Sequence, residues 1–217
     1  MLEAHYVIYL GLLMVSWLLS ISLCMRGQRR YLPLCVLLSV TFWMELSVYW
    51  LYANGIEFVW IYHIYVLFEY TLLCIYFMQI TSKKYHRVIQ VSIGVFVVAS
   101  LSISYWYYQF KSFPGANINT AGVLLCVLCT YALMTLDIRR YDAIFKHPDF
   151  WISLGLLIFY GGTFFSNGLY SYLYTIDPVQ AKKLFAIINK PLNLILYSCF
   201  IIGFICAIPR RSTIRLS

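Results

Sequence analysis

The sequence predicts an all-α integral membrane protein with a bundle of seven transmembrane helices, and three observations support this fold class. Hydrophobic residues make up 62% of the 217 residues and charged residues only 11%, whereas soluble domains carry about 25% charged residues. Long apolar runs alternate with short polar connections along the chain. Basic residues gather in every second connection. Lipid is therefore the expected solvent for most of the surface.

Each apolar run is long enough to cross a hydrocarbon core of about 30 Å, which takes roughly 20 helical residues. Charged residues, prolines and glycines separate the runs. The first run is expected to be a retained helix, because no Lys or Arg precedes it as in a signal peptide. All connections are short, so residues 1–217 are expected to form a single domain with no extramembrane domain. The seven runs are 6–25, 31–53, 57–80, 88–110, 120–136, 150–174 and 184–208.

The basic residues of the connections predict the orientation. Twelve fall on one side of the membrane and three on the other. The positive-inside rule places the twelve in the cytoplasm, so the N-terminus is expected outside and the C-terminus in the cytoplasm. The three are Lys111, Lys182 and Lys183, and the twelve are Arg26, Arg29, Arg30, Lys83, Lys84, Arg87, Arg139, Arg140, Lys146, Arg210, Arg211 and Arg215.

Four ionisable side chains lie inside the apolar runs, namely Glu45, His63, Glu69 and Lys190. Each costs about 2.5 to 3.5 kcal/mol on insertion scales, so such groups usually face the bundle interior and mark function. At 1.5 Å per residue, Glu45 lies about 12 Å below the outer end of its run, and His63 and Lys190 about 9 Å below theirs. Glu69 lies deeper, about 18 Å in.

Asparagines share the level of Lys190 and complete a polar layer. We expect an outward-facing pocket between the second, third, sixth and seventh runs, with Lys190 paired to Glu45 or to Glu69. The alternative is a structural ion pair, with asparagines that hydrogen-bond between helices. The candidate ligand-binding residues are Glu45, His63, Glu69, Asn167, Lys190 and Asn193.

Other polar and small residues are expected to be structural. Gly161 and Gly162 remove side chains where another helix can approach closely. Pro191 takes one hydrogen bond from the seventh helix and is expected to kink it. Asp149 precedes an apolar run and is expected to cap the sixth helix at its N-terminus.

Enzymatic chemistry is not expected. The sequence contains no H-E-x-x-H or G-x-S-x-G motif, which zinc proteases and serine hydrolases need. Cys126 and Cys129 form a C-x-x-C with no second pair and no nearby histidine, so neither a metal nor another cofactor is expected. The net charge of +8 comes from clusters between apolar runs, a pattern typical of membrane orientation and not of nucleic-acid binding.

Two segments, YHIYVLFEY at 62–70 and NKPLNLILY at 189–197, lie in a tyrosine-rich chain with short loops that resembles a family of small seven-transmembrane proteins of Bacteroidota. The resemblance implies a bacterial inner membrane and suggests signalling. We therefore expect a receptor-like sensor or accessory subunit that binds a small ligand or lipid and signals to a membrane or cytoplasmic protein partner. The alternatives are a small-solute or proton-coupled transporter that uses Glu69, and a structural scaffold subunit of a membrane complex.

Overall fold

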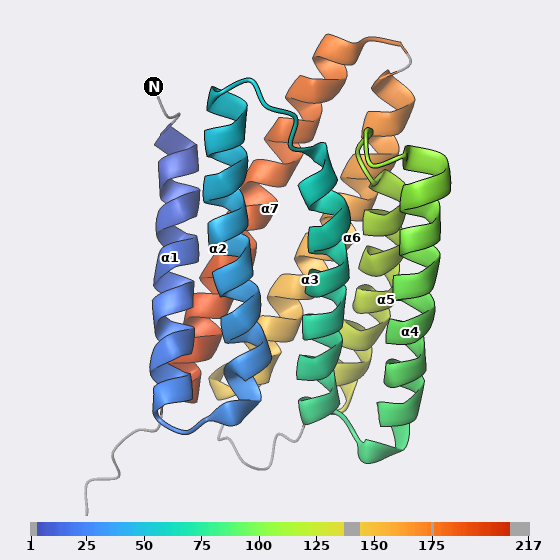
Figure 1. The fold of residues 1–217 in the computed structure, drawn as a ribbon. Coiled ribbons are helices and arrows are strands. Elements are labelled where there is room, and N and C mark those ends of the chain that lie inside the picture. The colour runs from blue at the N-terminus through green and yellow to red at the C-terminus, as the bar shows by residue number, and fades with distance from the viewer. Residues whose placement is uncertain (1–3, 137–143, 175, 209–217) are drawn as a thin grey trace, which may run out of the picture.

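The structure is a computed structural model that describes residues 4–136, 144–174 and 176–208. Within these ranges the protein is a bundle of long helices without strands (Figure 1). This confirms the all-α prediction. The long helices are α1 (Ala4–Met25), α2 (Leu32–Ala53), α3 (Val59–Ile80), α4 (His86–Ile103), α5 (Gly115–Met134), α6 (Pro148–Tyr174) and α7 (Pro178–Ala207).

Seven helices of the described chain are long and apolar enough to cross a membrane. Their outer surface is apolar as well. On α4, for example, Val88, Val95 and Val98 are each more than 60% exposed. Soluble monomers rarely expose contiguous apolar patches of this kind. The surface therefore fits a lipid environment, as the composition predicts.

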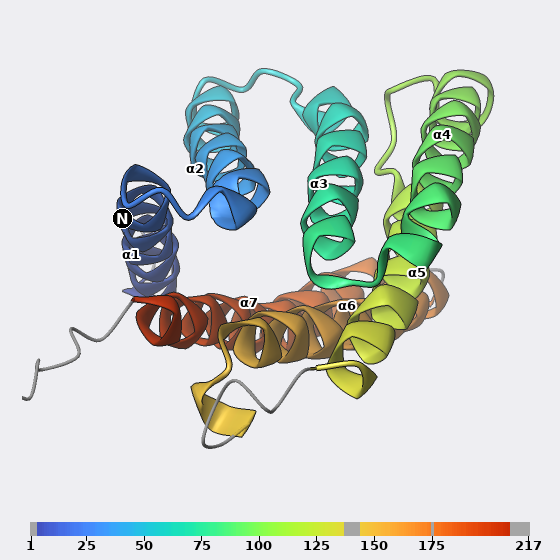
Figure 2. The same cartoon turned by 90° about the horizontal axis from the view of Figure 1, so that it is seen from below.

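The helices form two rows when the bundle is viewed along its axis (Figure 2). One row runs from α1 through α2 and α3 to α4, and the other runs from α7 through α6 to α5. The rows meet where α1 packs on α7 and where α5 packs on α3 and α4. Helix α2 packs mainly against its neighbours α1 and α3.

The two ends of the bundle are named here from Figure 1. The upper end carries the connections 54–58 and 109–114, and the lower end carries 26–28 and 81–82. At the lower end, the Gln28 side chain donates a hydrogen bond to the Ala207 carbonyl at 3.0 Å, which joins the connection between α1 and α2 to the end of α7.

Helices α6 and α7 pack closely because three glycines leave room for side chains of the opposite helix. A Cβ atom on Gly155 would lie 2.6 Å from the Cys199 Cβ, and one on Gly162 would lie 2.6 Å from the Leu192 side chain. Gly203 is similarly close to α6. The expected close approach is confirmed for Gly162, but it is wrong for Gly161, which has open space around it.

Two helices begin five or six residues earlier than the apolar runs predict. Helix α5 begins at Gly115 and not at residue 120, and α7 begins at Pro178 and not at residue 184. The Asp177 side chain caps α7, because it accepts hydrogen bonds from the backbone N–H groups of Val179 and Gln180 at 2.9 and 3.1 Å. The first turns of both helices contain polar residues and extend the helix beyond its apolar part, so the length of the apolar run does not include them.

Candidate functional site

A cavity of about 180 Å³ lies between the two rows, and we call it the central cavity. Helices α1, α2, α3, α5, α6 and α7 all contribute to its wall. Four of the six predicted ligand-binding residues, Glu45, Glu69, Asn167 and Asn193, line it. These four come from α2, α3, α6 and α7, the helices between which the pocket was expected.

Both carboxylates of the central cavity accept hydrogen bonds from tyrosines. The Tyr9 hydroxyl on α1 donates to Glu45 Oε1 at 2.9 Å. The Tyr65 hydroxyl donates to Glu69 Oε1 at 3.4 Å and lies 2.8 Å from the Thr41 hydroxyl on α2. These contacts join α1 to α2 and α2 to α3 across the wall of the cavity. Tyrosine is thus the residue type that the depth argument from sequence missed.

The asparagines of the cavity hold α7 and α6 in place. Asn189 Nδ2 donates to Ser166 Oγ on α6 at 2.8 Å, and Asn193 Nδ2 donates to the Asn189 carbonyl at 3.0 Å. Asn167 Nδ2 donates to Asn119 Oδ1 on α5 at 2.8 Å. The amides of Asn189 and Asn167 therefore contribute interhelical hydrogen bonds, as the structural alternative expected, whereas the bond of Asn193 lies within α7. All three asparagines also line the cavity.

Lys190 lines a second cavity of about 340 Å³, the upper cavity, together with Glu45 and the start of α1. The upper cavity shares Glu45, Asn189 and Asn193 with the central cavity, so the two adjoin. Lys190 is exposed. The pairing of Lys190 with Glu45 stays a prediction, and their common cavity is consistent with it.

His63 is buried on a different face of α3, away from the residues that line the central cavity. Its Nε2 donates to the Ser112 carbonyl at 2.9 Å, which leaves Nδ1 to accept from the Ser104 hydroxyl at 2.8 Å. Asn117 Nδ2 on α5 also donates to Ser104 Oγ, at 2.9 Å. His63 therefore joins α3 to the π-helical turn after α4 and to the connection before α5, and it is not among the residues that line the central cavity, where it was expected.

The segment that His63 contacts is irregular. Helix α4 ends in a π-helical turn, Ser104–Tyr108, followed by Gln109 and Phe110 with φ angles of 49° and 57°. Non-glycine residues with positive φ are uncommon. The His63 ring packs edge to face on the rings of Tyr108 and Phe110. These contacts fix a strained turn that the sequence did not reveal.

A buried polar cluster at the lower end was also missed. Asp149 is only 3% exposed. Its carboxylate accepts a hydrogen bond from the Tyr76 hydroxyl at 2.8 Å and forms an ion pair with Arg30 at 3.4 Å. The backbone N–H of Asp149 donates to His147 Nδ1 at 3.2 Å. Asp149 is thus the second residue of α6 and not its cap, so the capping prediction was wrong. We call Arg30, Tyr76, His147 and Asp149 the lower cluster.

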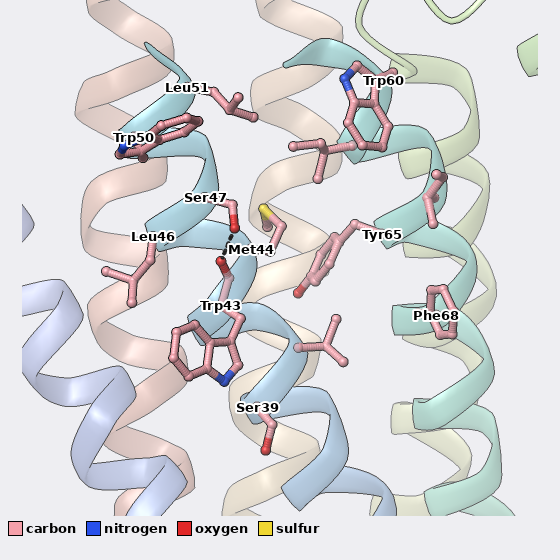
Figure 3. Close-up of a pocket in the computed structure, with 13 residues that line it drawn as sticks. Ser39, Trp43, Met44, Leu46, Ser47, Trp50, Leu51, Trp60, Tyr65 and Phe68 are labelled. Atoms are coloured by element: carbon pink, nitrogen blue, oxygen red, sulfur yellow. Dashed lines mark hydrogen bonds between the residues drawn. The ribbon is translucent and has the colours of Figure 1, made fainter. Parts of the chain in front are cut away.

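An apolar groove of about 800 Å³ runs between α2 and α3 on the outer surface (Figure 3). Trp43, Trp50 and Trp60 line it and are largely exposed. Met44 and Tyr65 lie between the two helices and also line the central cavity. The side chains of these two residues therefore separate the groove from the cavity.

The structure shows no candidate metal site in the described part of the chain. There, no group of three or more His, Cys, Asp or Glu side chains is arranged to hold a metal ion. Cys126 and Cys129 are free thiols on α5, with Cys129 buried in the core. Both fit the packing role that the apolar sequence around them indicates.

No family model, curated protein or solved structure matches this chain. The site is therefore defined by its own geometry. It is a small cavity with two carboxylates and three asparagines in a largely apolar, aromatic wall, inside a bundle of helices that are long and apolar enough to span a membrane.

Proposed function

We propose that this protein is a multi-pass protein of the bacterial inner membrane that acts as a receptor-like sensor or accessory subunit. It binds a small ligand in the central cavity and passes the change to a cytoplasmic protein partner. The observation that carries the proposal is the cavity itself, where Glu45, Glu69, Asn167 and Asn193 meet from four helices. A ligand that contacts them acts on the packing between the two rows.

The lower cluster supports a connection from the cavity to the opposite end. Helices α3 and α6 supply Glu69 and Asn167 to the cavity and also carry Tyr76 and Asp149. Arg30 lies in the short 3-10 turn Arg29–Tyr31 directly before α2, the helix of Glu45. A shift of these helices at the cavity therefore changes the geometry of an ion pair and a buried hydrogen bond at the lower end. Packed helices with polar contacts at both ends are a physical route for such coupling.

The proposed orientation has the upper end outside and the lower end in the cytoplasm. The count of twelve basic residues against three in the sequence supports it. Within the described chain, Lys111 lies in a connection of the upper end, and the basic residues in or beside the lower-end connections include Arg26, Arg29, Arg30, Lys83, Lys84 and Arg87. The upper cavity, with Lys190 and Glu45, then faces the outside, and the lower cluster lies where a cytoplasmic partner can contact the bundle.

Filling the cavity tests the coupling without knowledge of the ligand. In a background without the natural cysteines, Asn193→Cys is modified with benzyl methanethiosulfonate, which places a bulky group in the cavity. We expect hydrogen exchange at residues 26–34 and 144–152 to change on modification. The control is the same modification at Val95→Cys on the exposed face of α4. Unchanged exchange at the lower end with a filled cavity would contradict the sensor.

The alternative is a proton-coupled transporter, and the depth of Glu69 favours it. A carboxylate near the middle of a spanning helix is the usual site of proton transfer in transporters. A pH-sensitive dye trapped in vesicles with the reconstituted protein measures proton entry under an imposed potential. Entry that disappears in Glu69→Gln and persists in Glu57→Gln, at an exposed loop position, would favour the transporter.

A further inference from the structure

We propose that the ligand of the central cavity is a small organic cation, held by the Glu69 carboxylate and by the rings of the surrounding tyrosines. This inference rests on the proposed function, because it names the ligand class of the same cavity. Two independent features carry it, namely the balance of charges and the aromatic character of the wall.

The balance of charges favours a positive ligand. Glu45 and Glu69 line the central cavity, and the described residues of its wall include neither Lys nor Arg. Lys190 lines the upper cavity together with Glu45. Since Lys190 shares the upper cavity with Glu45 and does not line the central cavity, an ionised Glu69 has no cationic side chain beside it among the described residues of that cavity. A charge inside a spanning helix usually has a partner, and a monovalent cation supplies it.

The wall of the cavity is rich in aromatic rings. Tyr9 and Tyr197 pack edge to face with centroids 5.6 Å apart. The Tyr9 and Tyr65 hydroxyls bond to Glu45 and Glu69, which fixes these rings in the wall. Ring faces attract alkylammonium groups more strongly when the site excludes water. The aromatic residues that line the cavity are Tyr9, Tyr62, Tyr65, Phe113, Phe159, Tyr160, Phe185 and Tyr197.

The volume sets the size of the ligand. Since a cavity of about 150 Å³ accommodates benzene, the 180 Å³ of the central cavity hold a molecule of about six to eight non-hydrogen atoms. Choline, with a trimethylammonium head and a short hydroxyethyl arm, is within this range. The adjoining upper cavity of about 340 Å³ gives such a molecule a path from the upper end.

The test compares choline with 3,3-dimethyl-1-butanol, which has the same shape but carbon in place of the charged nitrogen. Binding of radiolabelled choline to the purified full chain is measured by equilibrium dialysis at constant ionic strength, with the alcohol as competitor. We expect choline to bind at least about tenfold more tightly than the alcohol. Equal affinity for the two, or no binding of choline at millimolar concentration, would overturn the proposal.

Two variants locate the bound cation. Glu69→Gln is expected to weaken choline binding at least about tenfold, and Glu57→Gln, at an exposed loop position, is expected to leave it unchanged. If Glu69→Gln does not fold, the Asn193→Cys protein modified with benzyl methanethiosulfonate replaces it. Choline binding that survives either change overturns the assignment to this cavity. The exchange experiment at the lower end uses no choline, so failure of the ligand class and failure of the sensor are distinguishable.

Discussion

Asp149 connects both rows at the lower end, because its carboxylate accepts from Tyr76 on α3 and pairs with Arg30 at the start of α2. A buried hydrogen bond to a charged group contributes about 1.5 to 3 kcal/mol, and the loss of one partner leaves the other without compensation. Because Arg30 is partly exposed, its share of the stabilisation is screened by solvent. Most of the effect is therefore expected from the Tyr76 contact.

The residue-scale prediction is that Asp149→Asn lowers the free energy of unfolding by about 2 kcal/mol. Thermal denaturation in detergent measures the change. The matched control is Asp177→Asn, where the side chain caps α7 and asparagine caps a helix as well as aspartate does. A stability loss as large in the Asp177 variant as in the Asp149 variant would show that the lower cluster has no special role.

The depth of a residue was predictable from the sequence, but its direction around the helix was not used. His63 and Glu69 are six residues apart on α3, so at 3.6 residues per turn their side chains point in directions roughly 120° apart. Tyr65 is one turn from Glu69 and shares its face, as the hydrogen bond between them confirms. The rotation per residue along α3 therefore places Tyr65 on the face of Glu69 and His63 off that face.

The sequence did not predict which side chains from distant helices contact one another. Asp149 has the local pattern of a capping residue, and only the structure shows that Tyr76 and Arg30, far away in the sequence, contact the two oxygens of its carboxylate. No role was predicted from the sequence for the tyrosines near the polar residues. Several of them line the central cavity, because tyrosine combines an apolar ring with a polar hydroxyl.

At the scale of the elements, the most specific contact is that of α6 with α7. Gly155 faces the Cβ of Cys199, an atom that cannot move without the backbone. Gly161, one and a half turns further along α6, has no atom within 4 Å of an added Cβ. Both changes to alanine gain the same helix propensity. A comparison of the two alanine variants therefore distinguishes the cost of close packing from the gain in helix propensity.

We expect Gly155→Ala to destabilise the protein by about 1 to 3 kcal/mol, the usual cost of overpacking a well-packed interface. Gly161→Ala is expected to be neutral or slightly stabilising. Melting temperatures of the two variants in the same detergent measure the difference. Equal melting temperatures would mean that α6 and α7 separate easily and that their close approach contributes little.

At the scale of the whole molecule, the number and order of the helices were predictable because the length of an apolar run is set by the thickness of the bilayer. The arrangement in two rows was not, since short connections permit several ways to place seven helices. The cavity arises from this arrangement, because α2 contacts mainly α1 and α3 and leaves space toward α6 and α7.

The proposed orientation predicts which loops react from outside. In the background without natural cysteines, Glu57→Cys at the upper end should react with an impermeant maleimide in intact cells, and Ser82→Cys at the lower end should not. Both positions are exposed. Both should react after the membrane is permeabilised. The reverse pattern in intact cells would place the lower end outside.

The position of Glu69 has an electrical consequence. It lies ten residues into α3, about 15 Å from the upper end of the helix and near the middle of a hydrocarbon core of about 30 Å. A monovalent cation that reaches it from the upper side crosses about half of the membrane potential. Since a full crossing is worth about 2.3 kcal/mol per 100 mV, the bound cation gains about 1.2 kcal/mol when the inside is negative. Its affinity then rises roughly sevenfold per 100 mV, so an energised cell would fill the cavity at concentrations that leave it empty after the potential collapses.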